Sequence, residues 1–450
     1  MKTARSGIGE RGPGGRRAMT ERALSEDRRL RFAVLAMLYA AQGIPDAMVL
    51  IVFPAFLAAR GVAPAGIGTF LAIAMLPNAA KLVIGPTVDR WAYLAMGRRK
   101  PWIMAGELGI ATSFGALALL PDPATQLALF TAGAFCVTLA TAVQDVATDA
   151  TAMDLIPPHE QGRANGVMWG SKTVGTALFA ALGALILDRA GFSAMVAAAL
   201  AILLGVLAVV ALVRERPGER LLPWTRGNAA QHANGSRPDT IRVIARQLSS
   251  ALREAGASRL IGLSLVIGML LGLAGAMAPV MMVQKFSWSP GDYAQFRGTL
   301  KLVSGLAGMA VGGWLIDRLG YRTMLLLSLS GIAAANLALA LAFTPGVAAA
   351  YLVIFECLLV FAFITFFAAT MQQCSRAIAA TQFSFTMVCG NLTMAAGARL
   401  LGPLIALGGI PAVAAMLCCT ALAGAVLFAF IPSSAAGPGA VAPGAGGAPF

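Results

Sequence analysis

Several charged side chains fall inside or at the edge of long apolar stretches of this chain, where charge is costly. Those that we single out are the acids Asp46, Glu107, Asp145, Asp149 and Glu356 and the bases Lys81, Lys172, Lys301 and Arg399. A charged residue inside lipid costs about 2.5–3.5 kcal/mol on insertion scales, so it usually faces a cavity or an opposite charge. These residue types therefore predict binding of a polar or charged solute, together with proton exchange.

Asp46 is the residue that we predict to exchange a proton. It directly follows a Gly-Ile-Pro sequence, which disturbs a helix and frees backbone carbonyl groups for a ligand. In a poorly hydrated cavity the ionised form of a carboxyl group is disfavoured, which suits reversible proton loading. The alternative is a permanent ion pair with Lys172 or Lys81.

Two further acids, Asp145 and Asp149, are four residues apart and therefore share one face of a helix. With Gln144 beside them they form a polar stripe that suits solute binding. For Asp149 we favour a different role, because it lies near the cytoplasmic end of its span. There it would pair with an arginine and hold the inward gate shut, the arginine being Arg90, Arg98 or Arg99.

The basic residues come from both halves of the chain and suit an anionic or carboxylate-bearing solute. The alternatives are ion pairs with Glu356, Asp145 or Asp46, or extension of the long side chains to the membrane surface. Acids are concentrated in the first half, which predicts that this half carries the proton while the second mainly holds the substrate. The predicted solute and proton pathway comprises Gln42, Asp46, Lys81, Gln144, Asp145, Lys172, Lys301, Glu356, Asn391 and Arg399.

The composition indicates an all-α membrane protein. Of the 450 residues, 58% are hydrophobic and only 12% are charged, and the mean hydropathy is +0.76. A soluble globule could not keep this much apolar surface out of water. Stretches of about 20 apolar residues predict twelve transmembrane helices, near residues 33–59, 66–88, 102–120, 125–148, 164–187, 192–213, 259–284, 294–316, 322–343, 347–371, 379–405 and 411–431.

The net charge of +14 reflects membrane topology. Nine lysines and arginines lie in residues 1–31 and nine in residues 214–259, whereas the loops on the opposite side carry only Arg60, Arg189 and Lys285. By the positive-inside rule both termini are cytoplasmic. We therefore expect no nucleic-acid partner.

The residue inventory argues against an enzyme. The six cysteines lie in or beside spans without disulfide or metal spacing, and the only histidines, His159 and His232, lie in loops. Neither a hydrolytic triad nor a histidine metal site can be built from them. No phosphate-binding glycine loop is present. We expect no cofactor and no metal. We expect the protein to be a monomer whose partners are a small-molecule substrate, protons and membrane lipid.

A short phrase occurs twice, about half the chain apart. The first copy, Gly-Pro-Thr-Val-Asp-Arg, starts at Gly85, and the second, Gly-Trp-Leu-Ile-Asp-Arg, starts 228 residues later at Gly313. This spacing indicates two parallel repeats of six spans. Such repeats build transporters whose substrate site lies near the bilayer midplane and which open to one side at a time. The predicted gating residues are Gly85, Asp89, Arg90, Arg98, Arg99, Asp149, Gly313, Asp317, Arg318 and Arg322.

These features divide the chain into five parts. They are a flexible basic cytoplasmic tail (1–31), an N-terminal six-helix bundle (32–213), a cytoplasmic linker (214–258), a C-terminal six-helix bundle (259–431) and a disordered tail (432–450). Within the linker, apolar residues recur at helical spacing from Ile241 to Leu252 with arginines between them. This pattern suggests an amphipathic helix on the cytoplasmic leaflet, and the alternative that we favour is a spacer helix with no specific partner.

The two Asp-Arg loops resemble those of the major facilitator superfamily, and four local phrases resemble one branch of it. The phrases are Gln42-Gly43-Ile44-Pro45, Lys81 with Gly85-Pro86 and Asp89-Arg90, Gly97-Arg98-Arg99-Lys100-Pro101-Trp102, and Gln144-Asp145-Val146-Ala147-Thr148-Asp149-Ala150. That branch contains AmpG-type muropeptide permeases, acetyl-CoA transporters and RhtX/FptX-type siderophore importers. The resemblance covers essentially the whole membrane region and implies the major facilitator fold.

The resemblance also implies a function, namely proton-driven uptake of a polar peptide-like solute, such as a muropeptide, across the inner membrane of a bacterium. The alternatives are a siderophore importer of the same branch, an exporter of drugs or metabolites, and a membrane receptor that moves nothing on the same scaffold. Buried charges in both halves favour transport over a receptor, because a static scaffold has little reason to carry residues that are costly to insert.

Overall fold

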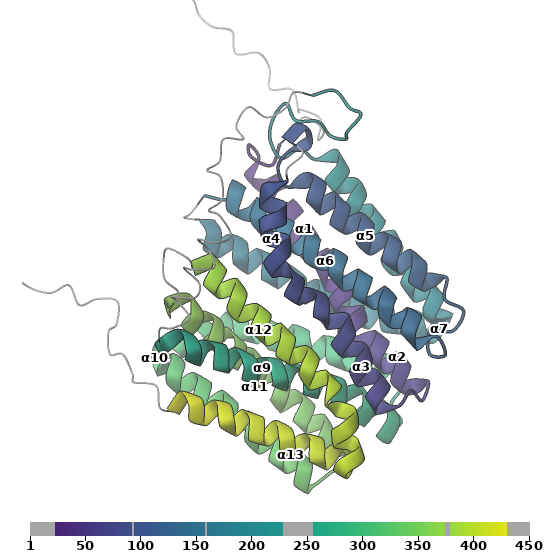
Figure 1. Ribbon diagram of the computed structural model, residues 1–450, viewed down its shortest axis with the longest axis vertical. Helices are drawn as coiled ribbons and strands as arrows, with labels where there is room; N and C mark the ends of the chain where they lie inside the picture. Colours follow the sequence, from purple (N-terminus) through teal and green to yellow (C-terminus); the bar gives the residue numbers. More distant parts are fainter. Residues whose placement is uncertain (1–22, 92–93, 158–159, 228–254, 374–378, 430–450) are drawn as a thin grey trace, which may run out of the picture. The chain divides into compact units, whose positions relative to one another are not determined.

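The computed structural model describes residues 23–91, 94–157, 160–227, 255–373 and 379–429 (Figure 1). Within these ranges every regular element is a helix, apart from one isolated bridge between Ala23 and Arg214. The all-α class predicted from composition is confirmed for this part of the chain. The helix predicted from Ile241 to Leu252, residues 1–22 of the predicted N-terminal tail and the whole predicted C-terminal tail lie outside the described residues, whereas residues 28–31 of the predicted N-terminal tail belong to the first helix, Arg28–Ala47.

The described helices group into two compact units. The first comprises residues 1–52 and 80–239 and contains α1 (Arg28–Ala47), a π-helix (Met48–Val52), α4 (Lys81–Arg90), a 3-10 helix (Leu94–Met96), α5 (Lys100–Ala118), α6 (Leu127–Leu155) and α7 (Gln161–Leu212). The second comprises residues 53–79 and 240–450 and contains α2 (Phe53–Ala59), α3 (Pro64–Met75), α9 (Ala255–Pro279), a π-helix (Val280–Lys285), α10 (Pro290–Leu341), α11 (Pro345–Gln373), α12 (Ala379–Arg399) and α13 (Leu401–Ala429). A 3-10 helix (Leu76–Ala80) joins α3 to α4.

Three long helices are interrupted at glycines. The backbone leaves the helical region at Gly191 in α7, at Gly320 in α10, and at Gly408 and Gly409 in α13. Among the described residues, eight helical stretches are long and apolar enough to cross a membrane. The fold is therefore that of a helical membrane protein, as the composition predicts.

In the first unit, α1 and α7 cross with their backbones in contact. A Cβ atom added to Gly175 would lie 2.1 Å from the carbonyl oxygen of Ala40, and one added to Gly43 would lie 2.3 Å from the amide nitrogen of Thr176. Glycine lets helices approach this closely because it has no side chain in the way. The crossing brings the polar residues beside Gly43 close to Lys172.

Residues 53–79 belong to the second unit, although the sequence predicts a first bundle that runs continuously from residue 32 to 213. The Gln284 side chain, in the π-helix after α9, donates hydrogen bonds to the carbonyl oxygens of Ala58 and Val62 at 3.2 and 2.8 Å. The switch between units falls at irregular helix, namely the π-helix Met48–Val52 and the 3-10 helix Leu76–Ala80. Irregular turns of this kind often mark hinges.

Candidate functional site

Two ion pairs lie inside the first unit and join four of its helices. Lys172 on α7 pairs with Asp46 on α1 at 3.1 Å, and Lys81 at the start of α4 pairs with Asp145 on α6 at 2.6 Å. The structure therefore brings together four residues of the predicted pathway. The pairs match the alternatives that the sequence left open for Asp46 and Lys81.

The local backbone explains the position of Asp46. The preceding residue, Pro45, has no N–H to donate, and the chain changes from α-helix to π-helix at Met48. Asp46 thus lies at an irregular point of the first helix, and about a third of its side chain is exposed (33%). The carboxylate is accessible as well as paired.

A hydrogen-bonded chain runs beside these ion pairs. The Gln42 side chain donates to Gln144 at 2.7 Å, and Gln144 donates to Glu107 on α5 at 3.1 Å. Glu107 is fully buried, and its second carboxylate oxygen has no partner in the described part of the chain. The sequence identifies Glu107 as an acid inside a span but assigns it no role, because its partner is far away along the chain.

Asp149 lies beside a tyrosine of the first helix, Tyr39. The hydroxyl of Tyr39 on α1 donates a hydrogen bond to the Asp149 carboxylate. Tyr39, Gln42 and Asp46 occupy positions i, i+3 and i+7 of the first helix, so they line one face of it. The helical spacing of Tyr39 relative to Gln42 and Asp46 is the sequence signal by which Tyr39 could have been found.

A second polar cluster lies in the second unit. The Glu356 carboxylate on α11 pairs with two cations on α10, Arg297 at 3.0 Å and Lys301 at 3.2 Å. Lys301 and Glu356 belong to the predicted pathway, whereas Arg297 does not. Arg297 is the fourth residue of the span predicted at 294–316, whereas it lies about two turns inside α10, which begins at Pro290.

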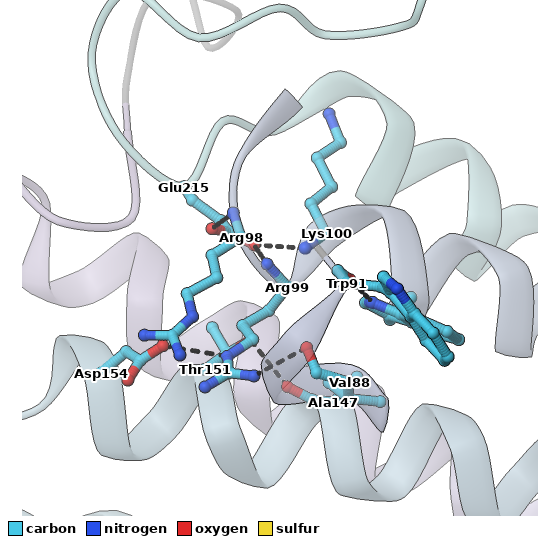
Figure 2. Close-up of polar contacts among 10 residues, drawn as sticks. Val88, Trp91, Arg98, Arg99, Lys100, Ala147, Thr151, Asp154 and Glu215 are labelled. Atoms are coloured by element: carbon cyan, nitrogen blue, oxygen red, sulfur yellow. Dashed lines mark hydrogen bonds and ion pairs between the residues drawn. The ribbon is translucent and has the colours of Figure 1, made fainter. Parts of the chain in front are cut away.

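The loop before α5 is held by Glu215, which follows α7 (Figure 2). The Glu215 carboxylate accepts hydrogen bonds from the backbone N–H groups of Arg98 and Arg99, both at 2.8 Å, and of Lys100. These amides belong to the start of α5, where unpaired N–H groups favour a negative charge. Gly97 is required here because its φ is +107° and an added Cβ would lie 2.7 Å from the Glu215 carboxylate.

The side chains of this loop are also engaged. Arg99 pairs with Asp154 on α6 at 3.0 Å and donates to the carbonyl oxygen of Val88 on α4 at 3.3 Å (Figure 2). The Lys100 ammonium donates to the carbonyl oxygens of Ala211, Val213 and Leu221. The predicted gating loop thus connects α4, α6 and the segment after α7, and Asp154 and Glu215 are acids that the sequence analysis does not single out.

Burial shifts the pKa values of the acids in this loop contact. It raises the pKa of Glu219 to about 7 from the ordinary 4.5, although the Arg216 amide, which donates to Glu219 at 2.9 Å, acts in the opposite direction. Burial also raises the pKa of Glu215 despite its three amide donors. It lowers the pKa of Lys100 to about 8.

We expect the loop contact to weaken as the pH rises from about 4.5 to 7. In that window the folded state binds a proton at Glu219 that the unfolded state has released, so folding stability falls with rising pH. Amide hydrogen exchange of Arg98–Lys100, corrected for its intrinsic pH dependence, measures this effect. The Glu219→Gln variant should show a smaller pH dependence, because only Glu215 then titrates with a raised pKa, whereas Glu26→Gln, at an exposed position, should keep the full dependence. An unchanged profile in Glu219→Gln would contradict the assignment.

The remaining predicted residues take varied places. Arg318 stacks on the Trp314 ring at 5.4 Å, and Arg322 donates to the carbonyl oxygen of Ala429. Asn391 is half-buried on α12, and Arg399 is exposed at the end of that helix. Gly85 lies on α4 with open space around it. The side-chain surroundings of Asp89, Arg90, Gly313 and Asp317 lie outside what the structure describes.

The chemistry available in these clusters is ionic and hydrogen-bonding. The acids and bases that approach one another inside the units form pairs, and the described residues contain no group of three His, Cys, Asp or Glu residues that could hold a metal ion. Paired charges that can exchange partners suit binding of a solute and a proton.

The family model of the Major Facilitator Superfamily matches residues 35–398. The chain belongs to the major facilitator superfamily. This confirms the superfamily that the two Asp-Arg loops resemble, and it makes the chain a membrane transporter rather than an enzyme.

Solved structures of other transporters share the fold. The nucleoside transporter NupG superposes with a TM-score of 0.67 at 13% identity, covering 88% of this chain and 98% of that one. A D-xylose-proton symporter superposes with a TM-score of 0.67 at 14% identity, covering 88% and 96%. At these identities the likeness concerns the fold alone.

The matches to proteins related in sequence cover shorter parts of the chain. The anhydromuropeptide permease of Escherichia coli (strain K12) is 29% identical over 132 residues, which is 29% of this chain and 26% of the permease. An uncharacterized protein of Haemophilus influenzae is 29% identical over 93 residues, 21% of this chain and 22% of that protein. The matched part thus spans about a quarter of each of these relatives.

Proposed function

We propose that this chain is a secondary active transporter of the bacterial inner membrane that couples proton entry to uptake of a polar, peptide-like solute such as a muropeptide. The observation that carries the proposal is the set of ion pairs inside the first unit, Lys172 with Asp46 and Lys81 with Asp145. Partial similarity to a permease named for anhydromuropeptides supports the solute class.

The proposal includes a topology of twelve spans in two six-helix repeats, with both termini in the cytoplasm. Breaks at Gly191, Gly320 and Gly408–Gly409 divide α7, α10 and the α12–α13 stretch at the places where the sequence predicts loops between spans. Each division leaves pieces long enough to cross a bilayer of about 30 Å. The basic residues around α4 and after α7 then lie on the cytoplasmic side.

The transport assay uses the full chain reconstituted in liposomes. With the interior alkaline, the vesicles should accumulate labelled anhydromuropeptide above equilibrium, and a protonophore should abolish this accumulation. Uptake of a ferric siderophore instead would favour the alternative cargo, and gradient-driven extrusion from inverted vesicles would indicate an exporter. If the protein binds these solutes but moves none of them under the gradient, the proposed function is wrong and a receptor is favoured.

Within this proposal Asp46 carries the coupling proton. Its ion pair with Lys172 is partly accessible, so a proton can reach the carboxylate and release the lysine. We expect Asp46→Asn to abolish pH-driven accumulation while leaving folded protein, because the asparagine keeps the shape and cannot titrate. Counterflow exchange without a gradient should persist in this variant.

Glu107→Gln is the matched control. Glu107 is fully buried and forms no ion pair in the described part of the chain, and the hydrogen bond that its Oε1 accepts from Gln144 can also be accepted by the amide oxygen of a glutamine. We expect Glu107→Gln to retain pH-driven accumulation. If Asp46→Asn retains coupling and Glu107→Gln loses it, Glu107 and not Asp46 carries the coupling proton.

A further inference from the structure

The cluster on α10 and α11 in the second unit has a charge imbalance. The two oxygens of Glu356 are each held by a different cation, Oε2 by Arg297 Nη1 at 3.0 Å and Oε1 by Lys301 Nζ at 3.2 Å. Two positive charges therefore face one negative charge. The side chains are largely buried, with 11% of Arg297, 6% of Glu356 and 30% of Lys301 exposed.

An unbalanced buried charge is costly unless a partner compensates it. Arg297 and Lys301 lie on one face of α10, four residues apart, and Tyr293 lies on the same face one turn earlier. No second carboxylate is paired with these cations among the described residues. The cluster of Arg297, Lys301 and Glu356 thus carries a net charge of about +1, because Glu356 is the one acid paired with these cations among the described residues.

The cluster also has unused hydrogen-bond donors. Arg297 Nε and the Tyr351 hydroxyl are buried and have no hydrogen-bond partner in the described part of the chain. Tyr351 lies on α11 within electrostatic range of Arg297 and Glu356, and only 2% of it is exposed. Buried polar atoms in folded proteins nearly always have a partner, so orphaned donors around an excess positive charge point to a missing acceptor.

We propose that the cluster of Arg297, Lys301 and Tyr351 binds a carboxylate group of the transported solute. The carboxylate would accept hydrogen bonds from Arg297 Nε and the Tyr351 hydroxyl. It would also supply a second negative charge, so that Arg297 and Lys301 no longer share the single charge of Glu356. Guanidinium and carboxylate groups match in geometry as well as charge. This assignment rests on the proposed function, because it names the chemical class of the solute.

The size of the imbalance favours a singly charged group. A monoanionic carboxylate brings the cluster to neutrality, whereas a phosphate monoester carries close to two negative charges at pH 7 and would leave an excess beside Glu356. A neutral amide could use the donors but would leave the charge uncompensated. The cluster therefore distinguishes a free acid from its amide and from phosphate.

The balance of charge also predicts how variants fold. Arg297→Gln leaves the pair Lys301–Glu356, and Lys301→Gln leaves the pair Arg297–Glu356, so each variant is neutral at the cluster. Both should fold at least as well as the parent chain without solute, since each removes an uncompensated charge. A purely structural role of these cations predicts the opposite, a loss of stability in both variants.

The test compares an anhydromuropeptide that has free carboxylates with the same compound fully amidated, and with inorganic phosphate. Binding to the purified full-length protein is measured by the solute-induced rise in unfolding temperature, which needs no proton gradient. We expect the free acid to bind and the amide to bind about 10- to 100-fold more weakly, as expected for loss of charge-assisted hydrogen bonds. Arg297→Gln and Lys301→Gln should lose about the same factor toward the acid, whereas Lys285→Gln, at an exposed position of the same unit, should lose none.

The outcomes separate this inference from the proposed function. Equal affinity for acid and amide, an equal effect of phosphate, no acid-specific binding at all, or destabilisation of both glutamine variants without solute would overturn the carboxylate assignment, even if gradient-driven uptake is observed. Acid-specific binding that both glutamine variants lose would support the assignment, even if no gradient drives transport and the proposed coupling is wrong.

Discussion

Replacing Gly175 with leucine is expected to leave almost no folded protein in the membrane. The added Cβ alone would lie 2.1 Å from the Ala40 carbonyl oxygen, a backbone atom that no side-chain rotation can move away. Overpacking usually costs about 1–3 kcal/mol when side chains can adjust. Here two helix backbones must separate, so we expect a loss beyond that range, which is a large share of a typical folding free energy of about 5–15 kcal/mol.

The loss should also reach the ion pair at this crossing. Separating α1 from α7 moves Asp46 away from Lys172, which are 3.1 Å apart across the two helices. The measurement is the monodisperse fraction in size-exclusion chromatography, followed by the unfolding temperature of whatever protein remains. Gly205→Leu is the matched control, because Gly205 lies on the same helix with open space around its Cα. A Gly175→Leu protein with the unfolding temperature of the Gly205→Leu protein would refute the close crossing.

The second large effect concerns the ion pair between Lys81 and Asp145. Lys81→Met should leave the Asp145 carboxylate without its 2.6 Å partner in a site where only 14% of the aspartate is exposed. Breaking a buried pair by removing one partner typically costs about 3–5 kcal/mol. Since 30% of Lys81 is accessible, solvent screening reduces the expected loss to about 2–3 kcal/mol. Uptake should be lost as well.

A double-mutant cycle separates stability from transport at this pair. Removing both charges in Lys81→Met with Asp145→Asn should restore most of the folding stability, because replacing a whole buried pair is often neutral. Uptake should remain absent in the double variant if the pair takes part in the transport cycle. Restored uptake would show that the pair only holds α4 against α6. Additive destabilisation by the two single changes would show that the pair contributes nothing.

Much of the fold follows from patterns that act locally. A span is recognisable because about 20 apolar residues in a row are needed to cross the bilayer, whatever they pack against. The breaks at Gly191 and Gly320 fall between predicted spans. They are also local, since glycine tolerates the positive φ found at both positions. The family follows from the Asp-Arg loops, whose residues are contiguous in sequence.

Other parts of the site depend on residues that are distant in sequence. Arg297 is the fourth residue of the span predicted at 294–316, where a charge resembles an interfacial residue, and the start of α10 at Pro290 places it about two turns inside the helix. Glu215 is not recognisable from the sequence because its partners are backbone amides, which have no signature in the side-chain sequence.

The sequence by itself determined that charged residues sit inside membrane spans and that such charges need a cavity or an opposite charge, because the cost of a charge in lipid depends mainly on the residue type and its depth. Only the tertiary structure decided which partner each charge has: Asp46 with Lys172, Lys81 with Asp145, and Glu356 with two cations rather than one. The reason is that an ion pair depends on distances of a few ångströms between helices, and these distances are set by how closely the backbones approach.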